Sequence, residues 1–177
     1  MFEDEASLTE DEGSQYAPRK NEDVETYVAR MHATHLPHFP EELLVEWLYC
    51  HHKSLSTYAF LFESLRFKRQ TWKLEDVPGC EAFNDQKFCV TFSRSFNDRA
   101  RDPLDWLAGY MSRHGTWNTP VVVLENLRGD IESPSWVTIR RPYHLLEGHR
   151  RLSFLVALRK QGRALDEHTI WLARKVL

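Results

Sequence analysis

The most informative segment of the chain is Leu145-Leu146-Glu147-Gly148-His149-Arg150-Arg151-Leu152. An apolar segment runs through a glycine into a segment in which apolar residues recur with helical spacing up to Gly162. The pattern predicts a strand, a tight turn at Gly148 and an amphipathic helix.

The residues of this turn favour an anionic ligand. Glycine lets a ligand approach the backbone closely, and the first turn of the helix offers free N–H groups at the positive end of its dipole. His149, Arg150 and Arg151 add cationic groups there, each costing the helix roughly 0.3–1 kcal/mol unless an anion offsets them. We therefore predict a phosphate site. On spacing alone, a solvated basic turn explains the pattern equally well.

The flanking residues predict further elements of a small mixed sheet with helices, an α/β (α+β) fold. A helix is expected to begin with Asp102 as N-cap and Pro103 in its first turn, and to end at Gly115. The four expected strands lie at Val121–Leu124, Trp136–Ile139, Tyr143–Leu146 and Thr169–Leu172.

Three regions are expected along the chain. Residues 1–20 form an acidic, disordered tail. Residues 21–69 form a helical extension packed on the core, with Pro40 in the first turn of one helix. Residues 70–177 form the domain that carries the turn. In its less regular first part we expect a short strand at Thr71–Leu74 and a half-buried strand at Phe88–Phe92.

Composition limits the class of protein. The 177 residues are 42% apolar, which is enough for a packed core. Residues 1–100 contain 11 Lys and Arg against 18 Asp and Glu, whereas residues 101–177 contain 12 against 8, so an anionic ligand is expected on the C-terminal part. Three cysteines without a CxxC pair predict neither a disulfide framework nor a cysteine zinc site. No apolar run reaches membrane-spanning length, and we expect a cytoplasmic protein with no membrane partner.

Two segments carry a resemblance to a known superfamily. They are Trp117-Asn118-Thr119-Pro120-Val121-Val122-Val123 and Tyr143-His144-Leu145-Leu146-Glu147-Gly148-His149-Arg150-Arg151-Leu152. Together with Gly115 they resemble the ParB/sulfiredoxin superfamily in its D-G-H-x-R variant, with Glu147 in place of Asp, over roughly residues 70–177. The resemblance implies a loop that holds nucleotide phosphates, with ATP, ADP or CTP and Mg²⁺ as the implied ligands.

The chain also departs from that superfamily. Gly148 stands where sulfiredoxin has its reactive cysteine, and His149 stands where partition ParB has Glu. The sequence stops at Leu177, and we expect no helix-turn-helix domain for operator DNA.

The candidate site residues follow from the loop and the resemblance. Phosphate or nucleotide binding is expected from Gly148, His149, Arg150, Arg151, Asn118 and Thr119. Glu147 and His149 are the catalytic candidates, Glu147 as a ligand of Mg²⁺ or as an activating base and His149 as general acid or base. Their alternatives are a helix-capping acceptor and a simple hydrogen-bond donor. The expected pocket rim comprises Trp117, Glu125, Asn126 and His168.

His32, His35 and His38 have a spacing that invites a metal ion, but Pro37 interrupts the helix before the third. We expect a solvated helix end there, and no metal site apart from Mg²⁺ at Glu147.

These observations predict a nucleotide- or phosphate-binding ParB-like module with a weak NTPase or phosphotransfer activity. One alternative is a non-enzymatic module that binds nucleic acid or a protein, with the N-terminal helical region as the protein-binding surface. The other is a metal-dependent DNA nuclease. The sequence lacks a long run of Lys interleaved with aromatic residues, which argues against tight nonspecific binding of nucleic acid.

Overall fold

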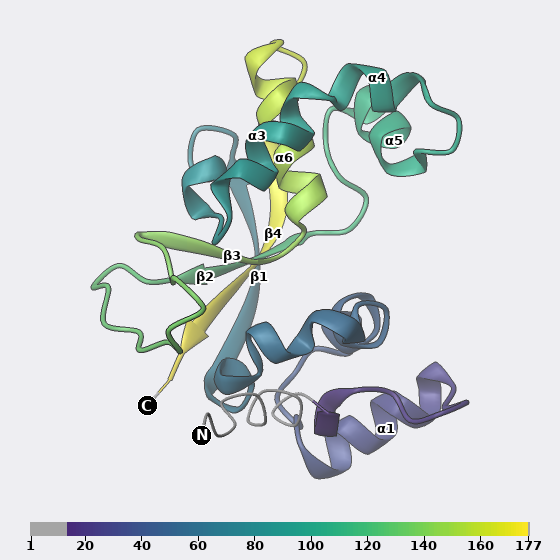
Figure 1. The fold of residues 1–177 in the computed structure, drawn as a ribbon, viewed down its shortest axis with the longest axis vertical. Helices are drawn as coiled ribbons and strands as arrows, with labels where there is room; N and C mark the ends of the chain where they lie inside the picture. Colours follow the sequence, from purple (N-terminus) through teal and green to yellow (C-terminus); the bar gives the residue numbers. More distant parts are fainter. Residues whose placement is uncertain (1–13, 177) are drawn as a thin grey trace, which may run out of the picture. The chain divides into compact units, whose positions relative to one another are not determined.

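A computed structural model describes residues 14–176 of the chain. Most of the predicted acidic tail lies outside the described residues. The chain divides into two compact units, one formed by Met1–Phe67 with Lys175–Leu177 and the other by Lys68–Arg174 (Figure 1).

A four-stranded mixed sheet lies largely within the second unit, which confirms the predicted α+β class. Its strands are β1 (Leu65–Lys73), β2 (Val121–Glu125), β3 (Tyr143–Glu147) and β4 (Glu167–Lys175), in the spatial order β1-β4-β2-β3. Strand β2 pairs in parallel with β4 and antiparallel with β3. The first four residues of β2 are buried, and burial on both faces of the sheet accounts for its continuous apolar run.

Helices of the second unit cover this sheet. They are η5 (Cys80–Ala82), α3 (Gln86–Arg94), α4 (Phe96–Arg101), α5 (Trp106–His114) and α6 (His149–Lys160). Helix α6 carries eight buried residues in succession and packs against α3, which lies beside it in Figure 1. Its apolar face joins the buried side of β2 in one core, including Val121, Leu152 and Leu155.

The structure corrects three sequence expectations in this unit. Phe88–Phe92 is helical, because it belongs to α3, where the rings of Phe88 and Phe92 stack one turn apart with centroids 4.3 Å from each other. Trp136–Ile139 forms no strand, since β2 pairs directly with β3. Helix α5 begins later than expected and is capped by Asp105, whose carboxylate accepts a hydrogen bond from the Ala108 N–H.

The first unit is helical, as expected. It contains η1 (Ser14–Tyr16), α1 (Val24–Thr34), α2 (Glu41–Leu43), the π-helical η2 (Leu44–Tyr49), and the 3₁₀ segments η3 (His52–Thr57) and η4 (Ala59–Ser64). Asp23 caps α1, while Pro40 precedes α2 as its N-cap. Side chains such as Tyr27, Leu48 and Phe62 form its interior.

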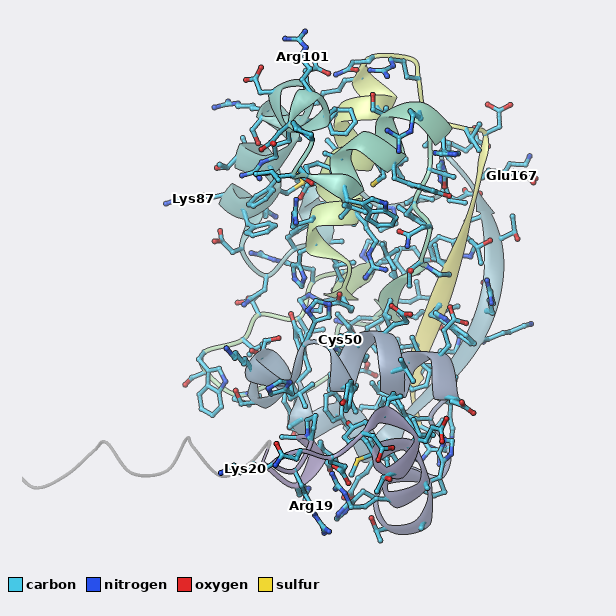
Figure 2. The ribbon with its side chains drawn as sticks, turned by 90° about the vertical axis from the view of Figure 1, so that its right-hand side faces the viewer. Arg19, Lys20, Cys50, Lys87, Arg101 and Glu167 are labelled. Atoms are coloured by element: carbon cyan, nitrogen blue, oxygen red, sulfur yellow. A yellow bond between two sulfur atoms is a disulfide. The ribbon has the colours of Figure 1, made fainter. Side chains whose placement is uncertain are left out.

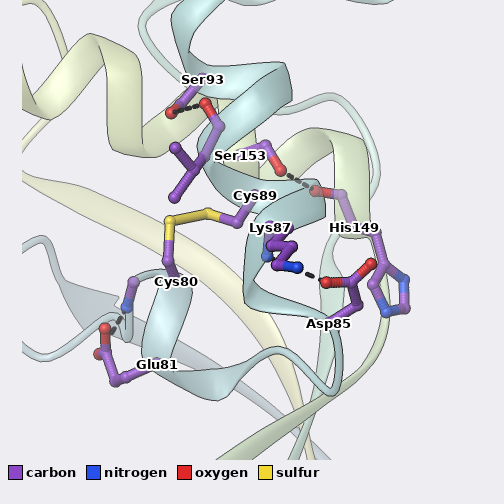
Figure 3. The surroundings of a disulfide bond; sticks show 10 residues. Cys80, Glu81, Asp85, Lys87, Cys89, Ser93, His149 and Ser153 are labelled. Atoms are coloured by element: carbon purple, nitrogen blue, oxygen red, sulfur yellow. Dashed lines mark hydrogen bonds between the residues drawn. A yellow bond between two sulfur atoms is a disulfide. The ribbon is translucent and has the colours of Figure 1, made fainter.

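Cys80 and Cys89 form one disulfide, which the spacing of the three cysteines did not predict. The bond joins η5 to α3 (Figure 3), where the turn between them brings the two Cα atoms to 5.4 Å. Cys50, the third cysteine, is free and exposed. None of the helices within residues 14–176 is both long and apolar enough to cross a membrane.

Replacing Cys80 and Cys89 with serine, or reducing the bond, should lower the free energy of unfolding by about 2–3 kcal/mol, because the unfolded chain loses a cross-link that closes a short loop. Urea denaturation followed by circular dichroism measures the change. Cys50→Ser is the matched control and should leave the midpoint unchanged. Identical midpoints for the oxidised and reduced protein would contradict the assignment of a stabilising disulfide.

Candidate functional site

Gly148 forms the turn between β3 and α6. Its φ of 98° and ψ of 30° place it in the left-handed region that glycine tolerates best. A Cβ atom at this position would lie 2.5 Å from Cγ1 of Val121, so any side chain would also collide with β2. Within residues 14–176 no side chain caps α6, so no side chain accepts from the N–H groups of its first turn at the cap position.

Arg151 anchors the start of α6 to two neighbouring segments. Its Nη1 donates to the carbonyl oxygens of Thr119 at 2.8 Å and Pro120 at 3.3 Å, and its Nη2 donates to Oε1 of Glu147 at 3.0 Å. Both charged side chains of this ion pair are largely buried. Arg151 therefore joins the end of β3, the first turn of α6 and the segment leading into β2.

Arg150 has different partners, on α3, α4 and α5. Its Nη2 donates to Oδ2 of Asp105 at 2.6 Å, and Nη1 of Arg99 approaches the same oxygen at 3.3 Å. Both guanidinium groups also lie over the ring of Phe92, at 4.5 Å for Arg99 and 5.8 Å for Arg150. Two cations thus share one carboxylate.

The exposure of these groups is uneven. The side chains of Arg150 and Arg99 are 42% and 40% exposed, whereas that of Asp105 is only 8% exposed. Nε of Arg150 is enclosed and has no hydrogen-bond partner in the described part of the chain. This arrangement leaves surplus positive charge at the surface beside the start of α6.

His149 lies against the segment that the disulfide closes. The plane of its ring is nearly perpendicular to the rings of Phe83 and Phe88, at centroid distances of 5.4 Å and 6.0 Å. Figure 3 shows His149 beside the turn that leads into α3. Burial lowers the pKa of His149, and the nearby Glu147 carboxylate opposes this shift only in part. The ring is consequently neutral at pH 7, with one nitrogen as donor and the other as acceptor.

The segment before β2 is fixed by His168 of β4. Nδ1 of His168 lies 2.8 Å from Oγ1 of Thr116, and its Nε2 lies 2.9 Å from the Leu165 carbonyl oxygen. Trp117 is buried and donates from Nε1 to the Thr169 carbonyl at 2.8 Å. The exposed Asn118 donates to Oγ1 of Thr119. Thr116, Trp117, Asn118 and Pro120 also line a small cavity of about 170 Å³, together with Arg69, Glu167 and Thr169.

The predicted rim residues do not all lie together. Val122 of β2 pairs with Glu147, whereas Glu125 pairs with Tyr143 at the other end of both strands. Because β3 runs antiparallel to β2, its carboxyl end and Gly148 lie beside the amino end of β2. Trp117 and His168 therefore share the end that carries Gly148, and Glu125 and Asn126 lie at the opposite end.

Glu125 and Asn126 have structural partners at that opposite end. Glu125 accepts two hydrogen bonds from Arg174, at 2.9 Å and 3.0 Å. Asn126 is buried, and its Nδ2 donates to the Arg140 carbonyl at 3.2 Å. Both contacts hold the long connection between β2 and β3 and the end of β4.

A larger hollow, of about 600 Å³, opens at the β1–β4 side of the sheet. Its lining side chains carry both signs of charge and include none of the predicted site residues: Lys73, Leu74, Glu75, Arg159, Asp166 and Glu167.

His32, His35 and His38 each have a different partner. Nε2 of His32 lies 2.9 Å from the Phe39 carbonyl oxygen, Nε2 of His38 lies 2.9 Å from that of Phe62, and His35 packs edge-on against Tyr16. Within the described ranges, no group of three or more His, Cys, Asp and Glu side chains could hold a metal ion.

Sequence reasoning did not find Arg99 and Asp105 as neighbours of the loop. Asp105 had a usable signal, since an aspartate three residues before Ala108 is a helix N-cap pattern. Arg99 had none, because it reaches the loop only through the fold. Comparisons with family models, with curated proteins and with solved structures find no match to this chain.

Gly148→Ala should lower the free energy of unfolding by more than about 2 kcal/mol, because a left-handed backbone costs an alanine roughly 1–2 kcal/mol and the new methyl group would also strike Val121. Urea denaturation provides the measurement. Gly162→Ala is the matched control, since Gly162 has a similar positive φ of 64° but open space where the Cβ would lie. Equal losses for the two variants would contradict the importance of the close approach.

His144 predicts a pH dependence of stability. It is fully buried, its Nδ1 accepts a hydrogen bond from the Arg140 N–H at 3.1 Å, and burial lowers its pKa from 6.5 to about 3. As the pH falls, His144 of the unfolded chain binds a proton before His144 of the folded chain does. The stability that neutral His144 contributes is therefore complete above pH 6.5 and declines as the pH falls from 6.5 towards 3.

His144→Asn keeps an acceptor near the Nδ1 position and removes the proton-binding site. The slope of unfolding free energy against pH between 6 and 4 should fall by up to about 1.4 kcal/mol per pH unit. His52→Asn, at an exposed position, is the control. An unchanged slope in His144→Asn would contradict the assignment of this pH dependence to His144.

Proposed function

We propose that the second unit is a phosphate-binding module of the ParB/sulfiredoxin type, and that it takes a nucleotide through the start of α6. The observation that carries the proposal is the pair of half-exposed guanidinium groups, Arg150 and Arg99, which share the single carboxylate of Asp105 beside an uncapped helix start. A phosphate oxygen can accept from both the guanidinium groups and the backbone N–H groups.

Within this proposal, Arg150 and Arg151 have separate roles. Arg151 is committed to Glu147 and to the carbonyls of Thr119 and Pro120, and it positions the backbone. Arg150 contacts the phosphate. Its half-exposed guanidinium and its place in the first turn of α6 support this division.

The neighbouring side chains can complete the grip on the ligand. A neutral His149 donates one hydrogen bond to a phosphate oxygen. Arg151 holds the backbone of the half-buried Thr119, and the neighbouring Asn118 is exposed and lines the small cavity. That cavity is smaller than the 300–1,000 Å³ of common small-molecule sites, which fits a phosphate or a sugar better than a whole nucleotide.

Binding without catalysis is the form of this proposal that the contacts support best. The Glu147 carboxylate bonds the Arg151 guanidinium at 3.0 Å, and this contact competes with the binding of Mg²⁺ or the activation of an attacking hydroxyl. A steady release of phosphate from ATP or CTP that Glu147→Gln abolishes would instead make the module an NTPase. Cleavage of DNA that requires a divalent metal would favour a nuclease.

Isothermal titration with ATP, CTP and ADP, with and without Mg²⁺, tests the proposal. Arg150→Gln should weaken nucleotide binding by at least about tenfold, because a hydrogen bond to a charged group contributes about 1.5–3 kcal/mol. Arg99→Gln should weaken it in the same direction. Arg128→Gln, an exposed arginine in the β2–β3 connection, is the control and should bind normally.

Unfolding curves of each variant separate lost binding from lost folding. Wild-type protein that binds none of the three nucleotides at millimolar concentration would overturn the proposal. So would folded Arg150→Gln and Arg99→Gln variants that bind as tightly as the wild type.

A further inference from the structure

Helix α5 carries a ladder of three aromatic rings, defined here as Trp106, Tyr110 and His114. They are spaced four residues apart and so project from one face of the helix. The centroids of Trp106 and Tyr110 are 5.5 Å apart with an interplanar angle of 31°, and those of Tyr110 and His114 are 4.1 Å apart at 16°. Nδ1 of His114 also bonds the Tyr110 carbonyl oxygen at 2.8 Å, and this bond fixes the orientation of the His114 ring.

The ladder faces solvent. Trp106 is 59% exposed, His114 is exposed and Tyr110 is half-buried, whereas the core-facing Ala108 and Met111 of the same helix are fully buried. Leu104, just before the helix, is 91% exposed. Tyr110 also packs partly against the core of the unit. Because Tyr110 and His114 cover one another's faces, the exposed aromatic surface lies at the two ends of the ladder, on Trp106 and His114.

Basic side chains border both ends of the ladder. At the amino end, Asp105 precedes Trp106 and holds Arg99 and Arg150. At the carboxyl end, Arg163 donates to the carbonyl and to the hydroxyl of Ser112, at 2.9 Å and 2.8 Å, and Arg113 lies in the last turn of α5.

Of the acidic residues near the ladder, Asp105 is nearly buried and paired, whereas Asp98 and Asp102 are exposed. Asp102 accepts from the Leu104 N–H, Asp105 caps α5 and pairs with two arginines, and Asp98 lies 4.0 Å from Arg101. Arg101 points outward at the end of α4 (Figure 2). The whole unit from Lys68 to Arg174 contains 17 Lys and Arg against 13 Asp and Glu, a net charge of +4.

We propose that this face of α5 binds single-stranded nucleic acid. An unstacked base would stack on the exposed ring at either end of the ladder, Trp106 or His114, and the arginines bordering these ends would take the phosphates; this pairing of aromatic platform and basic border is what single strands require. The nine residues of α5 span about 13 Å, enough for about two nucleotides. An apolar protein surface would instead bury the bordering arginines without a charged partner, which is unfavourable. The ladder shares Arg99 and Arg150 with the proposed phosphate site, but the variants that test it are made at Trp106 and Arg113, which lie outside that site.

Fluorescence anisotropy with labelled dT₁₀ and rU₁₀ in 50 mM salt tests it. The bases and phosphates are common to both strands, so both should bind. Trp106→Ala should weaken binding by about 5- to 100-fold, the range that loss of one stacked base produces, and Trp106→Phe should restore most of it. Arg113→Gln should reduce the slope of log affinity against log salt by about one.

Trp136→Ala is the matched control, because Trp136 is 57% exposed in the β2–β3 connection and should be neutral. Excess ATP should weaken dT₁₀ binding only in part, because Arg99 and Arg150 border both sites whereas Trp106 and Arg113 belong to the ladder alone. Failure of the wild type to bind either strand, or equal binding by Trp106→Ala, would overturn the proposal. So would a dimer of the chain in sedimentation that Trp106→Ala abolishes, since that result assigns the face to a protein contact.

Discussion

Arg151 carries a guanidinium group into a nearly buried position where β3, α6 and the segment before β2 meet. A charge removed from water is costly unless it is paired and hydrogen-bonded. Arg151 meets this demand with a carboxylate from the end of β3 and two carbonyls from the segment that enters β2. The need to satisfy one buried cation therefore holds three segments in register, and it fixes the backbone from which Gly148 turns.

The same helix start explains why the adjacent arginines behave differently. Successive residues on an α-helix are rotated by about 100°, so neighbours do not face the same way. Once Arg151 points toward Thr119, Arg150 must point elsewhere, and it finds Asp105 at the start of α5. Sequence adjacency suggested one shared anion, but helical geometry assigns the two guanidinium groups to separate surroundings.

Local signals in the sequence were strong where burial and backbone constraints coincide. The run at Val121–Leu124, the helix after Gly148, the strand at Thr169–Leu172 and the left-handed Gly115 are all confirmed. In each case an apolar pattern is bounded by a residue that starts or ends the helix or strand.

Features that depend on distant segments were missed. Phe88 and Phe92 fit either a strand or a helix in isolation, and packing against α6 settles the choice. The Cys80–Cys89 bond needs a turn that no spacing rule announces. Arg99 and Asp105 meet Arg150 only because α4 and α5 pack together beside α6. The sequence contained the side chains of the candidate site, but their grouping follows from tertiary structure.

The connection between β2 and β3 leaves the sheet at the end that carries Glu125 and Asn126, away from Gly148. Its residues Leu127–Asp130 are exposed, while Asn126 and Arg140 tie its two ends to the body of the unit. An affinity tag or a reporter peptide spliced between Arg128 and Asp130 would thus extend from the opposite end of the strands. Residues can therefore be inserted in this connection without disturbing the geometry at the start of α6.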